Sequence, residues 1–238
     1  MIVSNTVEHE LKYIINNTRA NDITAWLSRY CEPDPEFPQG MISSIYYDTL
    51  NWKYLDQKFN SFYLKTKVRL RWYSDLKYSY HYDAAFVEVK YKIGSRRDKA
   101  RVSSPYSGSE IAGMSLEDGR LLRMPALLSS KGVVIKDKLL PAFQITYKRF
   151  RYIDPFSGSR ICFDFDIHSP RTNRIMIPYL NSVILQTAVF EVKGGEHYRF
   201  TSLRKTHGAA VPRRSASVRI LWQNDSGNAV PYEGPVAE

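Results

Sequence analysis

The sequence has only two cysteines, Cys31 and Cys162, among its 238 residues. Two thiols build neither a disulfide framework nor a cluster of zinc ligands, so we expect a reducing compartment and no zinc site. No apolar run approaches the length needed to cross a bilayer, and residues 1–12 carry acidic side chains where a signal peptide is basic and then apolar. We therefore expect a soluble, cytoplasmic protein.

Two common signatures of phosphate and acid–base chemistry are also missing. The chain has no glycine-rich loop of the Walker type, so we expect phosphates to be held by side chains. Of the five histidines, His9 takes an outward strand position and His81 lies in a polar segment rich in tyrosine, and neither has an evident catalytic partner. Lysine, arginine and the carboxylates remain as the chemically informative side chains.

What the sequence does have is an excess of positive charge. It contains 34 lysines and arginines against 24 aspartates and glutamates, a formal net charge of +10, and the basic residues are spread along the chain. Such an excess indicates an anionic partner, and at this point phosphates, nucleic acid and an anionic membrane surface all stay open.

Apolar and polar residues alternate with period two in many segments, which predicts a protein rich in β-strands. The predicted strands are 7–15, 41–48, 63–73, 85–91, 99–103, 142–152, 160–167 and 188–193. Helices are expected from a cap at Asn21 or Asp22 to Tyr30 and over 116–128, and a turn at 154–158 predicts an antiparallel hairpin. Because the periodicity then fades, we expect one domain over 1–205 and a loosely held, partly disordered segment over 206–238.

The alternation places charges together on one face of the predicted sheet. Lys67, Arg69 and Arg71 point to one side of their strand, whereas Leu70 and Trp72 point to the other. The polar faces of the other strands carry Glu8, Glu10 and Lys12; Phe86, Glu88 and Lys90; Arg97, Lys99 and Arg101; Tyr147, Arg149 and Arg151; Arg160, Cys162, Asp164 and Asp166; Val189, Glu191 and Lys193. Like charges within several Å cost about 1 kcal/mol per pair in water and more in a cavity, so we expect a polyanion or a metal ion on this face.

Carboxylates among these cations indicate the kind of anion site. Glu8 and Glu10 face the same way from one strand, and Glu191 lies near the end of the predicted fold. Carboxylate oxygens suit Mg²⁺ or Mn²⁺, which bind one or two carboxylates together with phosphate oxygens and water. A simpler interpretation stays open at this point: a solvated edge strand whose acids pair with neighbouring lysines.

Several short segments follow one another along the chain in a specific order. They are Glu8-His9-Glu10-Leu11-Lys12-Tyr13, Ser44-Ile45-Tyr46-Tyr47-Asp48-Thr49, Lys67-Val68-Arg69-Leu70-Arg71-Trp72-Tyr73, Phe86-Val87-Glu88-Val89-Lys90, Lys99-Ala100-Arg101, Tyr147-Lys148-Arg149, Arg160-Ile161-Cys162-Phe163-Asp164 and Phe190-Glu191-Val192-Lys193. In order and spacing they resemble the VTC domain of polyphosphate polymerases, a branch of the triphosphate tunnel metalloenzymes, which include the CYTH proteins. Cys162 stands where that family usually has threonine.

The resemblance implies an α+β fold, an antiparallel β-barrel tunnel with helices packed outside. It implies a metal-dependent enzyme that transfers the terminal phosphoryl group of ATP to a growing polyphosphate chain. The implied residues are Lys12, Arg69, Arg71, Lys90 and Arg149 for catalysis, Lys99, Arg101, Arg160 and Lys193 for phosphate binding, and Glu191, Glu10 and Glu8 for Mn²⁺ or Mg²⁺. It further implies a membrane protein partner, which would place the chain at the periphery of a membrane, and no nucleic acid.

One departure bears on the activity. The family usually carries a Ser-Lys pair near its C-terminus whose lysine reaches the tunnel, whereas this chain has Ser215-Ala216-Ser217-Val218. Arg213, Arg214 or Arg219 would have to take the place of that lysine. Each of them offers a rigid planar guanidinium, whereas lysine offers a compact ammonium group. Two alternatives therefore stay open: a tri- or polyphosphatase of the same fold, and a non-catalytic module that binds polyphosphate or nucleic acid.

Overall fold

The structure, a computed structural model, describes residues 9–60, 62–94, 96–179 and 182–194 and two short strands near the C-terminus. The strands are β1 (His9–Asn16), β2 (Glu32–Pro33), β3 (Gln39–Asp48), β4 (Leu64–Ser74), β5 (His81–Ile93), β6 (Arg96–Ser103), β7 (Leu140–Ile153), β8 (Arg160–Ser169), β9 (Val183–Ile184), β10 (Thr187–Gly194), β11 (Trp222–Gln223) and β12 (Ala229–Val230). The first ten form one antiparallel sheet in the order β1-β10-β8-β7-β3-β4-β5-β6, with β2 beside β7 and β9 beside β8.

Short helices join these strands. They are the 3₁₀ helix η1 (Asn17–Arg19), α1 (Ala20–Tyr30), α2 (Lys53–Phe59), α3 (Gly108–Gly113), α4 (Gly119–Arg123) and the 3₁₀ helix η2 (Met124–Lys131). Within the described part of the chain, none of these helices is long and apolar enough to cross a membrane. Both cysteines are free thiols, as expected.

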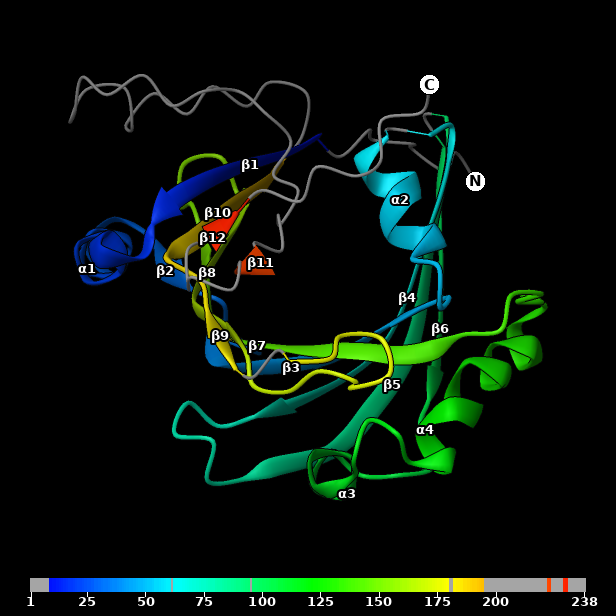
Figure 1. Cartoon of the computed structure of the whole chain (residues 1–238). Helices are drawn as coiled ribbons and strands as arrows, with labels where there is room; N and C mark the ends of the chain where they lie inside the picture. The colour runs from blue at the N-terminus through cyan, green and yellow to red at the C-terminus, as the bar shows by residue number, and fades with distance from the viewer. Residues whose placement is uncertain are drawn as a thin grey trace.

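The long sheet curls so that its two edge strands face each other. Figure 1 shows β1 and β10 on one side of the molecule and β4 to β6 on the other, with β3 and β7 crossing between them. The edges β1 and β6 are not paired by backbone hydrogen bonds, but Arg97 Nη1 on β6 lies 3.4 Å from Glu10 Oε2 on β1. The predicted antiparallel tunnel with helices is thus confirmed, and its sheet stays open along one seam.

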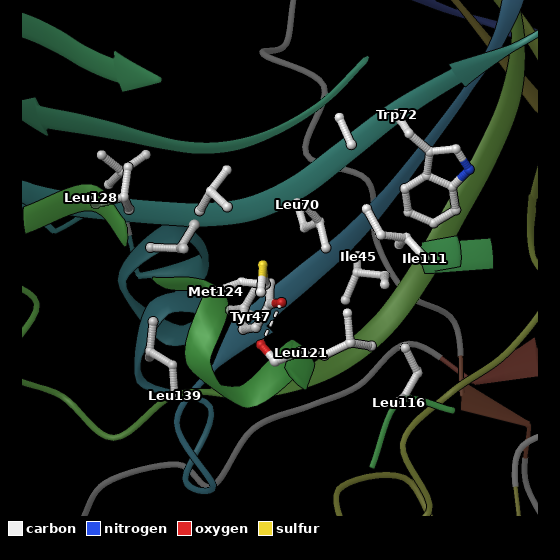
Figure 2. Close-up of a cluster of buried hydrophobic side chains, with 14 of the residues drawn as sticks. Ile45, Tyr47, Leu70, Trp72, Ile111, Leu116, Leu121, Met124, Leu128 and Leu139 are labelled. Atoms are coloured by element: carbon white, nitrogen blue, oxygen red, sulfur yellow. Dashed lines mark hydrogen bonds between the residues drawn. The ribbon is translucent and has the colours of Figure 1, made fainter. Parts of the chain in front are cut away.

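The main hydrophobic core lies on the outer face of the curl. Leu70 and Trp72 are fully buried there, and they belong to one cluster with Ile111 of α3 and Leu121 of α4. Figure 2 shows these side chains together, with the hydroxyl of Tyr47 donating to the carbonyl of Leu121 at 2.9 Å. A smaller cluster packs α1 against β8 and β10 in the same way. The helices cover the outer face. The inner face carries polar side chains together with a small apolar cluster that includes Ile42 and Tyr147.

The predicted strands and the predicted hairpin are confirmed, but the predicted helix ends are partly wrong. The first helix is preceded by η1, which Asn16 caps by accepting from the Thr18 amide, so the cap is neither Asn21 nor Asp22. The stretch predicted as one helix begins only at α4 and continues as η2, where Pro125 stands within the first two positions. Helices α2 and α3 were not predicted, because seven and six residues are too short for a helical period to stand out.

Candidate functional site

Nine basic residues predicted for the site lie on the inner face of the curled sheet, and we call them the cationic wall. They are Lys12, Arg69, Arg71, Lys90, Lys99, Arg101, Arg149, Arg160 and Lys193, and the strand registers place them on that face. Residues directly opposite each other in neighbouring strands point to the same side of a sheet. The registers therefore decide which charges meet.

One row across β4, β5 and β6 joins two arginines through a carboxylate. Arg69, Glu88 and Arg101 are direct cross-strand neighbours. Glu88 Oε2 accepts from Arg69 Nε at 2.7 Å, and Glu88 Oε1 accepts from Arg101 Nε at 2.8 Å. Burial alone would raise the pKa of the Glu88 carboxyl, but Arg69 and Arg71 lower that pKa to about 2. The carboxylate is ionised at any physiological pH.

The next row across the same three strands consists of lysines only. Lys67 lies opposite Lys90, which lies opposite Lys99. Among the residues that the structure describes, these three ammonium groups have no ion pair with a carboxylate. Desolvation by the surrounding wall, together with Arg69 and Arg71, lowers the pKa of Lys90. The lysine row is thus a line of basic side chains without a carboxylate partner among the described residues.

Arg71 is the buried cation of the wall, with 7% of its surface exposed. Its Nε donates to Ser44 Oγ at 3.0 Å, and its Nη2 donates to the Tyr147 hydroxyl at 3.2 Å. Both partners are neutral, and no carboxylate of the described residues pairs with it. A guanidinium positioned by neutral hydroxyls keeps its charge available for an anion.

Arg149 lies on β7, and two of its guanidinium nitrogens bind one carboxylate. Its Nε and Nη2 donate to the two oxygens of Asp164 at 2.5 and 2.6 Å. Asp166 was expected on the same face as Asp164, and this prediction is wrong. A register shift between β7 and β8 and a left-handed backbone at Asp166 (φ 51°) turn its side chain toward Lys148 and Asn17 instead.

The carboxylate end of the wall lies where β1 meets β10. Lys12 is directly opposite Glu191, and its Nζ lies 2.6 Å from Glu10 Oε1 and 2.8 Å from Glu191 Oε2. Lys193 holds the other oxygen of Glu191 at 2.9 Å. Burial alone would raise the pKa of Glu191, but the two lysines lower it to about 2. Two carboxylates, Glu10 and Glu191, therefore converge on one cation.

Some predicted residues remain unpaired or undescribed. Arg160 is exposed at the start of β8, opposite Lys193, and none of the described carboxylates forms an ion pair with it. Glu8 lies outside the described residues, as do the three C-terminal arginines considered as substitutes for a tunnel lysine. The 206–238 segment is described only at β11 and β12, so its predicted looseness stays a prediction.

The sequence interpretation missed two inner-face residues on β3, Ser44 and Tyr46. Ser44 binds Arg71, and the ring of Tyr46 lies 4.5 Å from Lys67 Nζ. The available signal was the alternation of β3, in which these two residues are flanked by the core residues Ile45 and Tyr47.

The solved structures that are similar to the chain include the following two. The PH1819 protein from Pyrococcus horikoshii OT3 is 13% identical at a TM-score of 0.42, over 79% of this chain and 77% of that one. A protein from Vibrio parahaemolyticus, provisionally assigned as an adenylate cyclase, is 14% identical at a TM-score of 0.39, over 77% of this chain and 74% of that one. No curated protein matches the chain. The family model of the VTC domain matches residues 7–215, a range that includes the whole cationic wall.

Proposed function

Because the chain belongs to the VTC domain family, we propose that it is a polyphosphate polymerase. It would transfer the terminal phosphoryl group of ATP to the end of a polyphosphate chain and release ADP. The family supports a polyphosphate-related tunnel enzyme. The polymerase activity, the use of ATP and the metal dependence are the parts that we propose.

The lysine row is the observation that carries the proposal. Lys67, Lys90 and Lys99 stand directly opposite one another on three strands, and like charges in such positions destabilise a sheet. A linear polyanion that runs along the tunnel removes this repulsion, since each phosphate offers oxygens to ammonium groups on neighbouring strands. Among the described side chains, no carboxylate forms an ion pair with this row.

The arginines suit phosphoryl transfer. The transition state spreads negative charge over the peripheral oxygens of the transferred group, so catalysis is mainly positioning and electrostatic stabilisation. Arg71 keeps its charge free through neutral partners, and Arg149 is oriented by Asp164. We propose that both guanidinium groups contact the phosphoryl group that is transferred.

Glu10 and Glu191 fit a divalent ion by their chemistry. Their carboxylates reach one common point, the ammonium nitrogen of Lys12, and the pKa of about 2 keeps Glu191 ionised. A bound Mn²⁺ or Mg²⁺ would neutralise phosphate charge and help to orient the reacting groups. Among the described residues, no three histidine, cysteine, aspartate or glutamate side chains gather closely enough to hold a metal. Phosphate oxygens and water would therefore complete its coordination.

A metal-dependent tri- or polyphosphatase is the second candidate. The observation in its favour is the sequence Ser215-Ala216-Ser217-Val218, which lacks the lysine of the family's Ser-Lys pair. In that reaction water takes the place of the phosphate acceptor, and the same wall would hold the substrate.

A product assay separates the candidates. Purified protein with labelled ATP and Mn²⁺ is expected to form an acid-stable polymer that polyphosphatase degrades. Release of inorganic phosphate without polymer contradicts the polymerase and supports the phosphatase. Binding of polyphosphate with neither product supports a non-catalytic module.

A paired substitution tests the carboxylate end of the wall. Glu191→Gln is expected to lower turnover by about 100-fold or more while polyphosphate binding is retained. Asp166→Asn is the control, because Asp166 also pairs with a lysine but points away from the tunnel. Equal turnover in the wild type and Glu191→Gln contradicts the proposed role of Glu191.

A further inference from the structure

Tyr46 lies within the cationic wall although its side chain is ordinarily neutral. It stands on β3 directly opposite Arg69 of β4. The ammonium nitrogen of Lys67 lies 4.5 Å from the centroid of its ring, and the ring of Phe143 on β7 lies 5.4 Å away. The phenol is thus held between two strands, on the face where a phosphate chain would pass.

Positive groups dominate the surroundings of Tyr46. The charged and titratable groups that act on it are Lys67, Arg69 and Arg71 from β4, Lys58 from α2 and Tyr147 from β7. Burial alone would raise the pKa of the Tyr46 phenol, but Lys67, Arg69 and Arg71 lower that pKa to about 6. Its ionisation therefore falls within the physiological range.

The Tyr46 oxygen differs in one respect from the carboxylates of the wall. Glu88 and Glu191, each with a pKa of about 2, stay charged when another anion approaches at neutral pH. A phenolate near its pKa loses its charge by taking up one proton, at little cost in free energy. Tyr46 is thus the anion of the wall that a phosphate chain displaces most easily.

We propose that the Tyr46 oxygen is an internal counter-ion of the cationic wall, a phenolate in the free protein that takes up one solvent proton when a phosphate chain binds beside Lys67 and Arg71. The inference rests on the proposed function, since it presupposes a phosphate chain in the tunnel. Only a proton moves, from solvent to the phenol oxygen, and no bond to phosphorus changes. The neutral phenol then donates a hydrogen bond to a phosphate oxygen.

The exchange links binding to pH. The negative phosphates raise the pKa of the nearby phenol, so the bound state holds one proton more than the free state above pH 6. The affinity for polyphosphate therefore falls as the pH rises, by up to about tenfold per pH unit. Removing the phenol oxygen removes the contribution of Tyr46 to this slope.

An absorbance titration of the free protein tests the first half of the proposal. The wild type is expected to show a tyrosinate absorbance step near pH 6 that Tyr46→Phe lacks. Tyr47→Phe is the matched control and keeps the step, because Tyr47 points into the core and its pKa is raised by burial. Lys67→Met moves the step to higher pH, since it removes a neighbouring cation. A wild type without the step, or a step that survives in Tyr46→Phe, overturns the proposal.

Calorimetry with long-chain polyphosphate tests the second half. Titrations near neutral pH in buffers of different ionisation heat are expected to show nearly one proton more taken up per wild-type protein than per Tyr46→Phe protein. Equal uptake by the two proteins, with binding observed, overturns the exchange alone. No binding by either protein overturns the proposed function and the exchange together, whereas the absorbance step reports on Tyr46 by itself.

Discussion

Replacing Glu88 with glutamine removes one negative charge from between two arginines and keeps the size of the side chain. Each carboxylate oxygen of Glu88 serves one guanidinium, Arg69 on one side and Arg101 on the other. The side chain is buried, with 8% of the residue surface exposed. The glutamine amide offers only one acceptor oxygen, so it leaves one arginine without its partner.

The magnitude follows from the pKa of Glu88. The folded protein lowers this pKa from 4.5 to about 2, and a difference of that size corresponds to about 3 kcal/mol. Because the folded-state pKa is depressed, the contribution to the unfolding free energy is complete above about pH 4.5 and is lost as the pH falls toward 2. We therefore expect Glu88→Gln to cost about 3 kcal/mol near pH 7.

Urea unfolding at several pH values measures this difference directly. The unfolding free energies of the wild type and Glu88→Gln are expected to differ near neutral pH and to converge in acid. Asp166→Asn is the control: Asp166 pairs with Lys148 at 2.8 Å, but 43% of its side chain is exposed, so we expect a loss of no more than about 1 kcal/mol. Equal stability of Glu88→Gln and the wild type at neutral pH, or a difference that persists unchanged in acid, would refute the reasoning.

Two further predictions concern the elements that support the wall. Gly108→Ala is expected to destabilise the fold by about 1–3 kcal/mol, because the new methyl group would lie 2.7 Å from the backbone oxygen of Tyr82. Gly119→Ala is the control: Gly119 is also the first residue of its helix, but no atom would lie within 4 Å of the new methyl group. This variant is expected to raise stability by about 0.4–1 kcal/mol. Thermal unfolding compares the two variants, and equal effects on stability contradict the packing argument. Asp48→Asn is expected to cost about 1–3 kcal/mol in the same measurement. The Asp48 carboxylate accepts the backbone amides of Thr49 and, in the first turn of α2, of Tyr54 and Leu55, and the amide side chain loses the acceptor that serves Leu55. Unchanged stability would contradict this role.

Ion pairs within the cationic wall explain how a tunnel with so many basic side chains can fold without a bound ligand. Some of its cations are balanced internally, as Arg149 is by Asp164 and Lys12 is by Glu191. The lysine row has no carboxylate partner among the described residues, and it lies on strands whose other face packs in the core. On β4, β5 and β6, Glu88 joins Arg69 to Arg101 in one row, and the neighbouring lysine row is the one proposed to bind the anion.

The sequence by itself determined the strands and their faces, because a period of two residues is a local property that each strand carries in its own order. Leu70 and Trp72 belong to the core and Arg69 and Arg71 to the wall for this reason alone. The carboxylates predicted as one end of the site also came from that alternation, together with the family resemblance.

The tertiary structure alone decided which charges meet. Lys12 reaches Glu191, and Glu88 joins Arg69 to Arg101, only through registers between strands that are far apart in sequence. The bulge that turns Asp166 out of the wall, and the register of β3 and β4 that places Tyr46 beside the cations of β4, are likewise set by contacts between strands. Pairing and curvature depend on the whole sheet, so no single strand contains the information that specifies them.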